Sequence, residues 1–175
     1  MKLNKLTTVL GVALVLTSGT VMAASQGQGT VTFKGSIIDA PCSIVPDSAD
    51  QTVDIGQVSS KVLQGGGTSS PQQFNIKLDG CALDTIKAVT AAFSGIADGN
   101  NLALQGGTAA GASIVIQDKT GKAIKINDAT GSSPYTLTDG SNNLQFSAFL
   151  QGNGASTAVK TGDFTSVASF VLAYQ

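Results

Sequence analysis

The chain contains many short runs in which apolar and polar residues alternate, and this pattern constrains its fold more than any other feature. Alternation with a period of two is typical of β-strands that bury one face. Residues 98–101, 118–121 and 139–142 are rich in Asp, Gly, Asn or Ser and separate several of these runs. Short strands joined by turns at intervals of about 8–12 residues predict an all-β sandwich, and the immunoglobulin-like sandwich is the leading member of that class.

The individual runs can be assigned to strands and turns. Residues with helical periodicity are scarce, so we expect no long helix. One helical turn is expected at 58–63, followed by a flexible connection in the Gly-rich segment 65–67. We predict strands at 29–38, 51–55, 74–81, 86–93, 112–117, 122–126, 134–137, 144–150 and 167–174, with a short strand or bulge at 158–160.

The first 23 residues are predicted to be a secretory signal peptide. Lys2 and Lys5 precede an apolar run at 6–16, and the sequence VMA at 21–23 matches a small-x-small cleavage site. The apolar run is shorter than the ~20 residues that a membrane-spanning helix needs. Cleavage after Ala23 would leave 175 − 23 = 152 residues, which is enough for one domain with its own core.

The composition argues against several classes of function. All 10 basic residues are Lys, all 11 acidic residues are Asp, and the chain has no His, Arg, Glu or Trp. Removing the two Lys of the signal peptide leaves 8 Lys and 11 Asp, a net charge of −3. A nucleic-acid partner is not expected, because it would require a basic patch rich in Arg and aromatic residues. Most of the usual acid–base and anion-binding side chains are missing, so an enzymatic activity is not expected either.

Cys42 and Cys81 are expected to form a disulfide bond. Export to an oxidising compartment favours such a bond. The bridge would span 81 − 42 = 39 residues, and the loop-closure entropy would then stabilise the fold by about 4 kcal/mol. Two thiols without His form a poor zinc site, and a Cys nucleophile would have no His to activate it. We therefore expect no metal and no other cofactor.

The two ends of the chain each carry a strand without an obvious partner. The row of the first strand that faces one side contains Val31, Phe33, Gly35 and Ile37. The last strand runs to the final residue, so we expect no later segment to pair with its far edge. An unpaired apolar edge is prone to aggregation unless it is filled. The terminal strands are therefore expected to complete one another, either within one chain or between two chains.

Several segments resemble the pilins of the chaperone–usher pathway of Gram-negative bacteria. GTVTFKGSIIDAPCSI is similar to the N-terminal extension that leads into the first cysteine, DQTVDIGQV to the segment after it, and FNIKLDGC to the strand with the second cysteine. GDFTSVASFVLAYQ resembles the C-terminal motif, with Tyr174 as the penultimate residue and Gly162 as the fourteenth from the end. The sequences QGQGTVTF, DAPCSI and SADQTVDIGQ are most similar to major rod subunits of P-type and mannose-resistant fimbriae.

This resemblance implies an incomplete immunoglobulin-like sandwich that lacks its seventh strand. Residues 42–175 would form the pilin domain, and 24–41 would form an extension that donates a strand to a neighbouring subunit. The donor row would be Val31, Phe33, Gly35 and Ile37, with Gly35 at a shallow pocket. The acceptor groove and the C-terminal motif would contain Gly162, Ala168, Phe170, Leu172, Tyr174 and Gln175.

The resemblance also implies partners and a location. A periplasmic chaperone would lend a strand to the groove and hold the terminal carboxylate of Gln175 with basic residues. At an outer-membrane usher, the extension of the next subunit would replace the chaperone strand, so that copies of the chain and related pilins join head to tail. The implied function is a structural, major subunit of a fimbria that supports adhesion at the surface of a Gram-negative cell.

Two alternatives belong to other classes of function. A self-complete secreted β-sandwich could bind carbohydrate, but no Trp and only Tyr135 and Tyr174 are available for an aromatic sugar platform. An enzyme would need a catalytic cluster. Asp47, Asp50 and Asp54 form the densest group of carboxylates, and their turn-like surroundings are typical of a solvated face.

Overall fold

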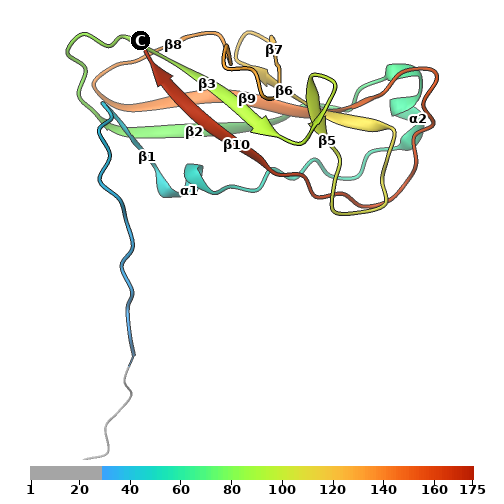
Figure 1. Ribbon diagram of the computed structural model, residues 1–175, viewed down its shortest axis with the longest axis horizontal. Helices are drawn as coiled ribbons and strands as arrows, with labels where there is room; N and C mark the ends of the chain where they lie inside the picture. The colour runs from blue at the N-terminus through green and yellow to red at the C-terminus, as the bar shows by residue number, and fades with distance from the viewer. Residues whose placement is uncertain (1–28) are drawn as a thin grey trace, which may run out of the picture. The chain divides into compact units, whose positions relative to one another are not determined.

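The computed structural model describes residues 29–175 of the chain (Figure 1). The predicted signal peptide and residues 24–28 of the predicted extension lie outside the described residues. The chain divides into two compact units, Met1–Ile37 and Ile38–Gln175. Residues 29–37, the described part of the first unit, contain no helix or strand and are exposed. The prediction of a strand at 29–38 is therefore wrong for the chain on its own, because none of the strands within 29–175 pairs with this segment.

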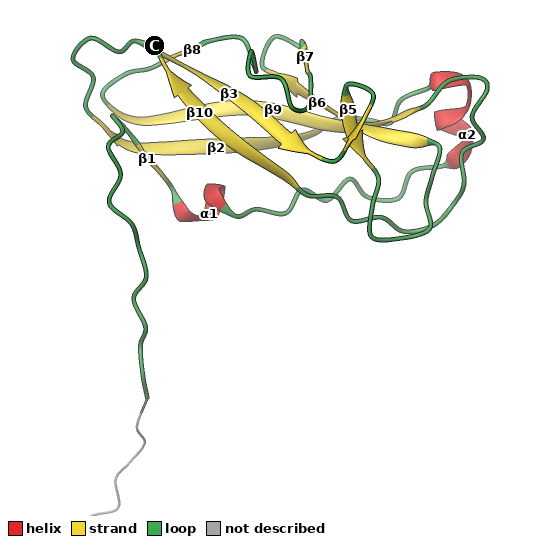
Figure 2. Cartoon of the chain, in the orientation of Figure 1, coloured by secondary structure: helices red, strands yellow, loops and turns green. Residues whose placement is uncertain are grey.

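The second unit is a sandwich of two antiparallel sheets (Figures 1 and 2). The larger sheet has the order β1-β2-β9-β6-β5-β4, with β7 paired to β6, and the smaller sheet has the order β10-β3-β8. The strands of the larger sheet are β1 (Ser43–Ile44), β2 (Gln72–Cys81), β4 (Ala97–Asp98), β5 (Asn101–Ala103), β6 (Ala112–Asp118), β7 (Ala123–Ile124) and β9 (Gly140–Gly152). Those of the smaller sheet are β3 (Ala88–Gly95), β8 (Tyr135–Thr136) and β10 (Ala168–Tyr174).

The helices of the second unit are limited to single turns. They are α1 (Pro46–Ala49), α2 (Ser60–Leu63) and the 3-10 turn η1 (Gln64–Gly66). The turn at α2 agrees with the helical turn predicted at 58–63. No helix among the described residues is long and apolar enough to cross a membrane.

The core lies between the two sheets and is built from the apolar faces of the alternating strands. Ile76 and Leu78 of β2 are fully buried, as are Leu144 and Phe146 of β9. Phe146 contacts Phe93 of the smaller sheet edge to face, with ring centroids 5.4 Å apart. Contacts of this kind stabilise a sandwich beyond the area that they bury. The predicted strands of both sheets are thus confirmed where one face is buried.

The predicted disulfide bond between Cys42 and Cys81 is present. Both cysteines are buried, and the bond joins the residue before β1 to the end of β2. The chain leading into the second unit is thereby fixed to the larger sheet at Cys42.

The segment 51–55 does not form the strand that its alternation predicts. It passes beside β2, but the hydrogen bond that connects them comes from the side chain of Gln51 to the carbonyl oxygen of Asn75, at 3.2 Å. A strand requires a ladder of main-chain hydrogen bonds. No such ladder forms between 51–55 and β2, so this part of the chain is extended without a strand partner.

A buried carboxylate connects the turn after β6 with the segment before β8. Asp118 accepts hydrogen bonds from the main-chain and hydroxyl groups of Thr120, from Lys122 N and from Ser133 N. Burial alone would raise the pKa of this carboxyl, but the hydrogen bonds from Thr120 and Ser133 outweigh it and hold the pKa far below its usual value. Asp118 is therefore charged and fully hydrogen-bonded at neutral pH.

We expect Asp118→Asn to lower the free energy of unfolding by about 1.5–3 kcal/mol, because hydrogen bonds to a buried charge are lost. The folded-state pKa of Asp118 lies below its unfolded-state pKa. Its contribution is therefore complete above about pH 5 and is lost as the pH falls toward the folded-state pKa. Urea unfolding at about pH 7 and about pH 3 measures both effects, and the difference between the variant and the wild type should shrink at the lower pH.

The matched control for this prediction is Asp128→Asn. Asp128 accepts a hydrogen bond from Thr130 N at an exposed turn, so this variant should change stability much less. Equal losses in the two variants would contradict the role assigned to Asp118.

Candidate functional site: an apolar groove with an open strand edge

A groove with a volume of about 1180 Å³ lies in the second unit. One wall is formed by 48–58, and the other is formed by 159–170. Apolar side chains from both sheets line the space between the walls, among them Phe74, Phe93, Leu102, Ile114, Ile116 and Leu150. The groove therefore gives direct access to the hydrophobic core of the sandwich.

Strand β10 borders the groove and presents two different faces. Phe170 and Leu172 belong to the row that faces the core and are half-buried, whereas Ser169 and Val171 face the opposite way and are exposed. β10 pairs with β3 along one edge, and within residues 29–175 no strand pairs with its other edge. Its free main-chain groups therefore form a template for one more strand.

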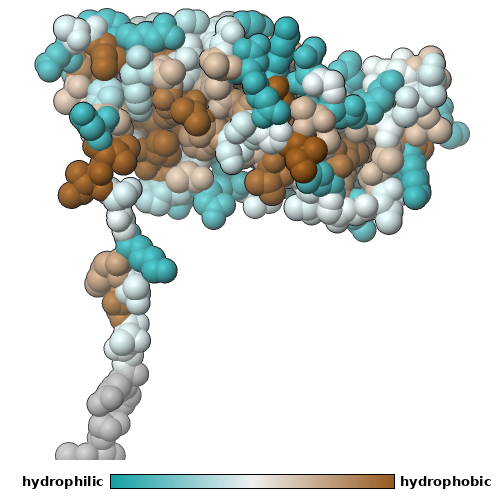
Figure 3. Space-filling view, viewed as in Figure 1, coloured by the Kyte–Doolittle hydropathy of each residue, from teal (hydrophilic) through white to brown (hydrophobic). Residues whose placement is uncertain are grey.

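The opposite wall of the groove also lacks a strand partner. Ile55 and Val58 pack against the core from this segment, which contributes apolar side chains without a main-chain ladder. The space between the walls is therefore bordered on both sides by extended chain. Figure 3 shows hydrophobic side chains gathered on the face of the molecule that carries β3 and β10.

Gly162 allows the wall formed by 159–170 to lie close to a neighbouring loop. Gly162 has a φ of +154°, and a Cβ at this position would lie 2.1 Å from Thr108 Oγ1 and 2.7 Å from Ala109 N. The same loop donates a hydrogen bond from Ala109 N to Asp163 O, at 3.2 Å. The close approach of the two backbones therefore requires a residue without a side chain at 162.

The end of β10 is fixed to the start of β3. The main-chain oxygen of Gln175 accepts hydrogen bonds from Lys87 N, at 2.8 Å, and Ala88 N, at 3.0 Å. Tyr174 packs against the core, and burial raises the pKa of its hydroxyl. These contacts place the C-terminal residues beside the smaller sheet.

The structure brings together some of the residues predicted for the acceptor groove. Gly162, Ala168 and Phe170 line the groove, whereas Leu172 and Tyr174 share the same strand face but lie beyond the lining residues. Sequence reasoning missed the wall at 48–58. The apolar residues of that wall were visible in the sequence, but their alternation was assigned to a strand of the sheet.

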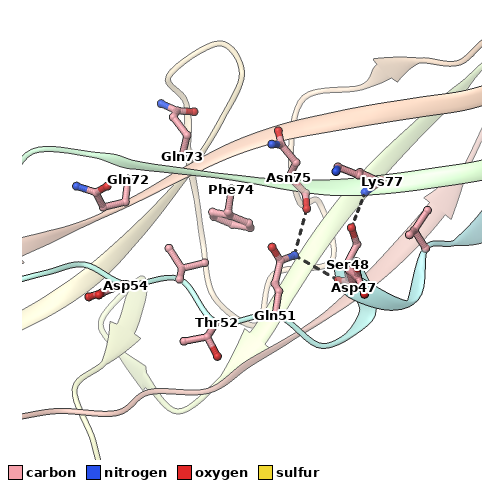
Figure 4. Close-up of a pocket in the computed structure, with 12 residues that line it drawn as sticks. Asp47, Ser48, Gln51, Thr52, Asp54, Gln72, Gln73, Phe74, Asn75 and Lys77 are labelled. Atoms are coloured by element: carbon pink, nitrogen blue, oxygen red, sulfur yellow. Dashed lines mark hydrogen bonds between the residues drawn. The ribbon is translucent and has the colours of Figure 1, made fainter.

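A second depression, with a volume of about 340 Å³, lies beside β2 (Figure 4). It is lined mainly by polar side chains, including Asp47 and Asp54 of the carboxylate cluster. Gln51 bridges this region by donating hydrogen bonds to the carbonyl oxygens of Ser48 and Asn75. Both carboxylates are exposed, in agreement with the interpretation of the cluster as a solvated face.

The sequence matches the family model for fimbrial proteins over residues 31–175. The Fimbria A protein of Serratia marcescens is 55% identical over 179 aligned residues, and the alignment covers 100% of both chains. The Major MR/P fimbria protein of Proteus mirabilis is 47% identical over 180 residues, again with 100% of both chains covered.

Two solved structures are similar to this chain in both fold and sequence. The P pilus rod subunit has 36% sequence identity and a TM-score of 0.68, over 78% of this chain and 100% of that one. A subunit in the structure of a chaperone–usher pilus has 38% identity and a TM-score of 0.74, over 86% of this chain and 97% of that one. The incomplete immunoglobulin-like sandwich predicted from the sequence is thereby confirmed.

We expect Gly162→Ala to lower the free energy of unfolding by about 1–3 kcal/mol, because the new methyl group collides with the backbone at 108–109. Gly154→Ala is the control, since Gly154 also has a positive φ, +91°, but has open space around its Cβ position. Thermal unfolding followed by circular dichroism compares the two variants. A loss at Gly154 as large as that at Gly162 would show that the close approach is unimportant.

Proposed function

Since the chain belongs to the fimbrial protein family, we propose that it is the structural subunit of a surface fimbria whose copies join by donating residues 24–41 to the groove of the next copy. The family consists of structural proteins, and the chain is not an enzyme. Strand addition from one protein to another is an established mode of recognition, and chaperone–pilin donor-strand complementation is a known example.

The observation that carries this proposal is the open edge of β10 beside the groove. A strand that enters there gains main-chain hydrogen bonds from β10 and places alternate side chains in an apolar space of about 1180 Å³. Both gains come from the same insertion. The groove is thus suited to an extended segment with an apolar row.

The described part of the proposed extension has such a row. The exposed fractions of Val31, Phe33 and Ile37 are 77%, 90% and 105%. Burying each of these side chains stabilises the assembly by about 1.5–3 kcal/mol. Gly35 belongs to the same row, and its small size suits a shallow part of the groove where the two backbones approach closely.

The donor segment and the acceptor groove are different surfaces of one chain. A contact between them is therefore heterologous, and heterologous contacts that do not close produce filaments. We place the donor extension at 24–41 and the pilin domain at 42–175, because the disulfide bond fixes the chain at Cys42. The compact unit that begins at Ile38 supports a boundary in this region.

Assembly also requires that the groove is protected before the next subunit arrives. We propose that a periplasmic chaperone fills it with a strand and binds Gln175 through basic residues. An outer-membrane usher then exchanges that strand for the extension of the next copy or of a related pilin. By this route the chain passes through the periplasm to the cell surface, where the fimbria supports adhesion.

The comparisons favour this function over a self-complete carbohydrate-binding sandwich. The two fimbrial relatives match the chain along their full length, so the similarity includes the extension as well as the sandwich. An open groove also argues against a module that is complete on its own.

We expect the mature chain without its extension to aggregate when purified alone, and a synthetic peptide of residues 24–40 to keep it soluble. Phe33→Ser in the peptide should weaken binding about 10- to 100-fold, because the burial of one large apolar side chain is lost. Lys34→Ser is the control, since Lys34 lies on the opposite face of the row and its loss should change the affinity less than about threefold. Fluorescence anisotropy of the labelled peptide measures both affinities.

Two results would contradict the proposed function. One is a soluble monomer that is stable without peptide or chaperone. The other is an equal loss of affinity for the Phe33 and Lys34 peptides, which would mean that the alternating row is not what the groove recognises.

A further inference from the structure

The three-stranded sheet has two outer edges, and they differ in their hydrogen bonding. β10 leaves one edge open beside the groove. On the other side, within the part of the chain that the structure describes, β8 pairs only with Ala88 and Val89 at the start of β3. The rest of β3 would therefore present a second free edge unless something other than a strand covered it. The residues between β7 and β8, 125–134, lie along this part of β3. We call this segment the edge loop.

Ser132 of the edge loop takes the place of a strand residue opposite Ala91. Ser132 N donates to the carbonyl oxygen of Ala91 at 2.9 Å, and the amide of Ala91 donates to Ser132 Oγ at 3.0 Å. Ser132 is buried. The hydroxyl oxygen thus replaces the main-chain acceptor that a paired strand would supply.

Gly131 allows the edge loop to approach β3 this closely. Its φ is +61°, and a Cβ at this position would lie 2.5 Å from the carbonyl oxygen of Ala91. Such a contact is too short for any side chain. The edge loop can therefore stay on β3 only if residue 131 is glycine.

Asn127 closes the end of the same edge. Its main-chain N–H donates to Phe93 O at 2.8 Å. Its side-chain amide then pairs with both main-chain groups of Gly95, accepting from Gly95 N at 3.1 Å and donating to Gly95 O at 3.0 Å. Asn127 has a φ of +65°, a conformation that Asn adopts more readily than most residues. One side chain thus imitates the donor and the acceptor of a neighbouring strand.

The buried carboxylate of Asp118 anchors the edge loop by a hydrogen bond. Its Oδ2 accepts a hydrogen bond from Ser133 N at 2.8 Å. Lys119 N, in the turn that follows, donates to the hydroxyl of Tyr135 at 3.2 Å. The loop that covers β3 is therefore anchored to the larger sheet as well as to the strand that it protects.

We propose that Asn127 and Ser132 are specificity-determining residues for strand addition, because they close the β3 edge and restrict an incoming strand to the edge of β10. This inference rests on the proposed function. A subunit with two acceptor edges would take strands from two neighbours and would form branched or disordered aggregates. A subunit with one acceptor and one donor forms an unbranched filament. Free strand edges in proteins are commonly blocked for the same reason.

The test uses the mature chain with its groove already filled by a peptide of residues 24–40. Asn127→Gly combined with Ser132→Ala removes the side-chain hydrogen bonds, and Gly at 127 keeps the positive φ without strain. Gly131→Ala is an independent variant that pushes the edge loop off β3 by a steric clash. Two readouts are needed: hydrogen exchange at the amides of Ala91 and Gly95, and the number of labelled peptides bound per chain.

In both variants we expect these amides to exchange about tenfold faster or more, and a second peptide to bind. Gly121→Ala is the control for the glycine, since Gly121 has a φ of +80° and open space around it. Asn142→Ala is the control for the Asn side chain, because Asn142 makes a similar pair of hydrogen bonds to the main chain of Thr138 away from the β3 edge. Both controls should bind one peptide and keep the exchange rates of the wild type.

Amides that stay protected in both variants would overturn the proposal, and so would an exposed β3 edge that takes no second peptide although the groove binds its own. A wild-type chain that binds no peptide at all would instead contradict the proposed function. The exchange rates at Ala91 and Gly95 would then still decide whether the two side chains close the edge.

Discussion

An unpaired strand edge beside an open hydrophobic core is the constraint on which the rest of this structure depends. Within the described residues β10 pairs with β3 along one edge only, and the groove next to it leaves apolar side chains such as Phe74 and Phe170 only partly buried. Water can hydrogen-bond to the free main-chain groups of β10, but contact between water and the apolar lining is unfavourable. A strand supplied from elsewhere satisfies both at once. This need accounts for the exposed row of Val31, Phe33 and Ile37 better than a role for that segment as a passive linker.

The two edges of the smaller sheet leave each subunit of the proposed assembly with a single acceptor edge. One edge is left open, while the other is closed by a loop whose side chains imitate a strand. The disulfide bond fixes the chain at Cys42, so that the extension leaves the domain from a defined point of the larger sheet.

Local pattern was sufficient to predict much of this fold. The alternation in β2, β6, β9 and β10 identified strands that bury one face, and two cysteines in an exported chain predicted the disulfide bond. Ala168 and Phe170 could be placed at the groove because the row of β10 is regular. The segment 51–55 was predicted wrongly, since alternation reports a buried face but not whether a pairing strand is present. The closure of β3 by Asn127 and Ser132 depends on contacts between distant residues and had no local signal.

The central claim is that the extension of one copy fills the groove of another, and disulfide trapping between engineered cysteines tests it most directly. Lys34→Cys would be combined in turn with Ser169→Cys, Val171→Cys and Ala173→Cys, which replace the outward-facing residues of β10. After mild oxidation of the assembled protein, the account predicts a ladder of covalent multimers on a denaturing gel for at least one pair, and its collapse to monomer on reduction. Cross-linked monomers without multimers would contradict the account, because they would show that the extension fills the groove of its own chain.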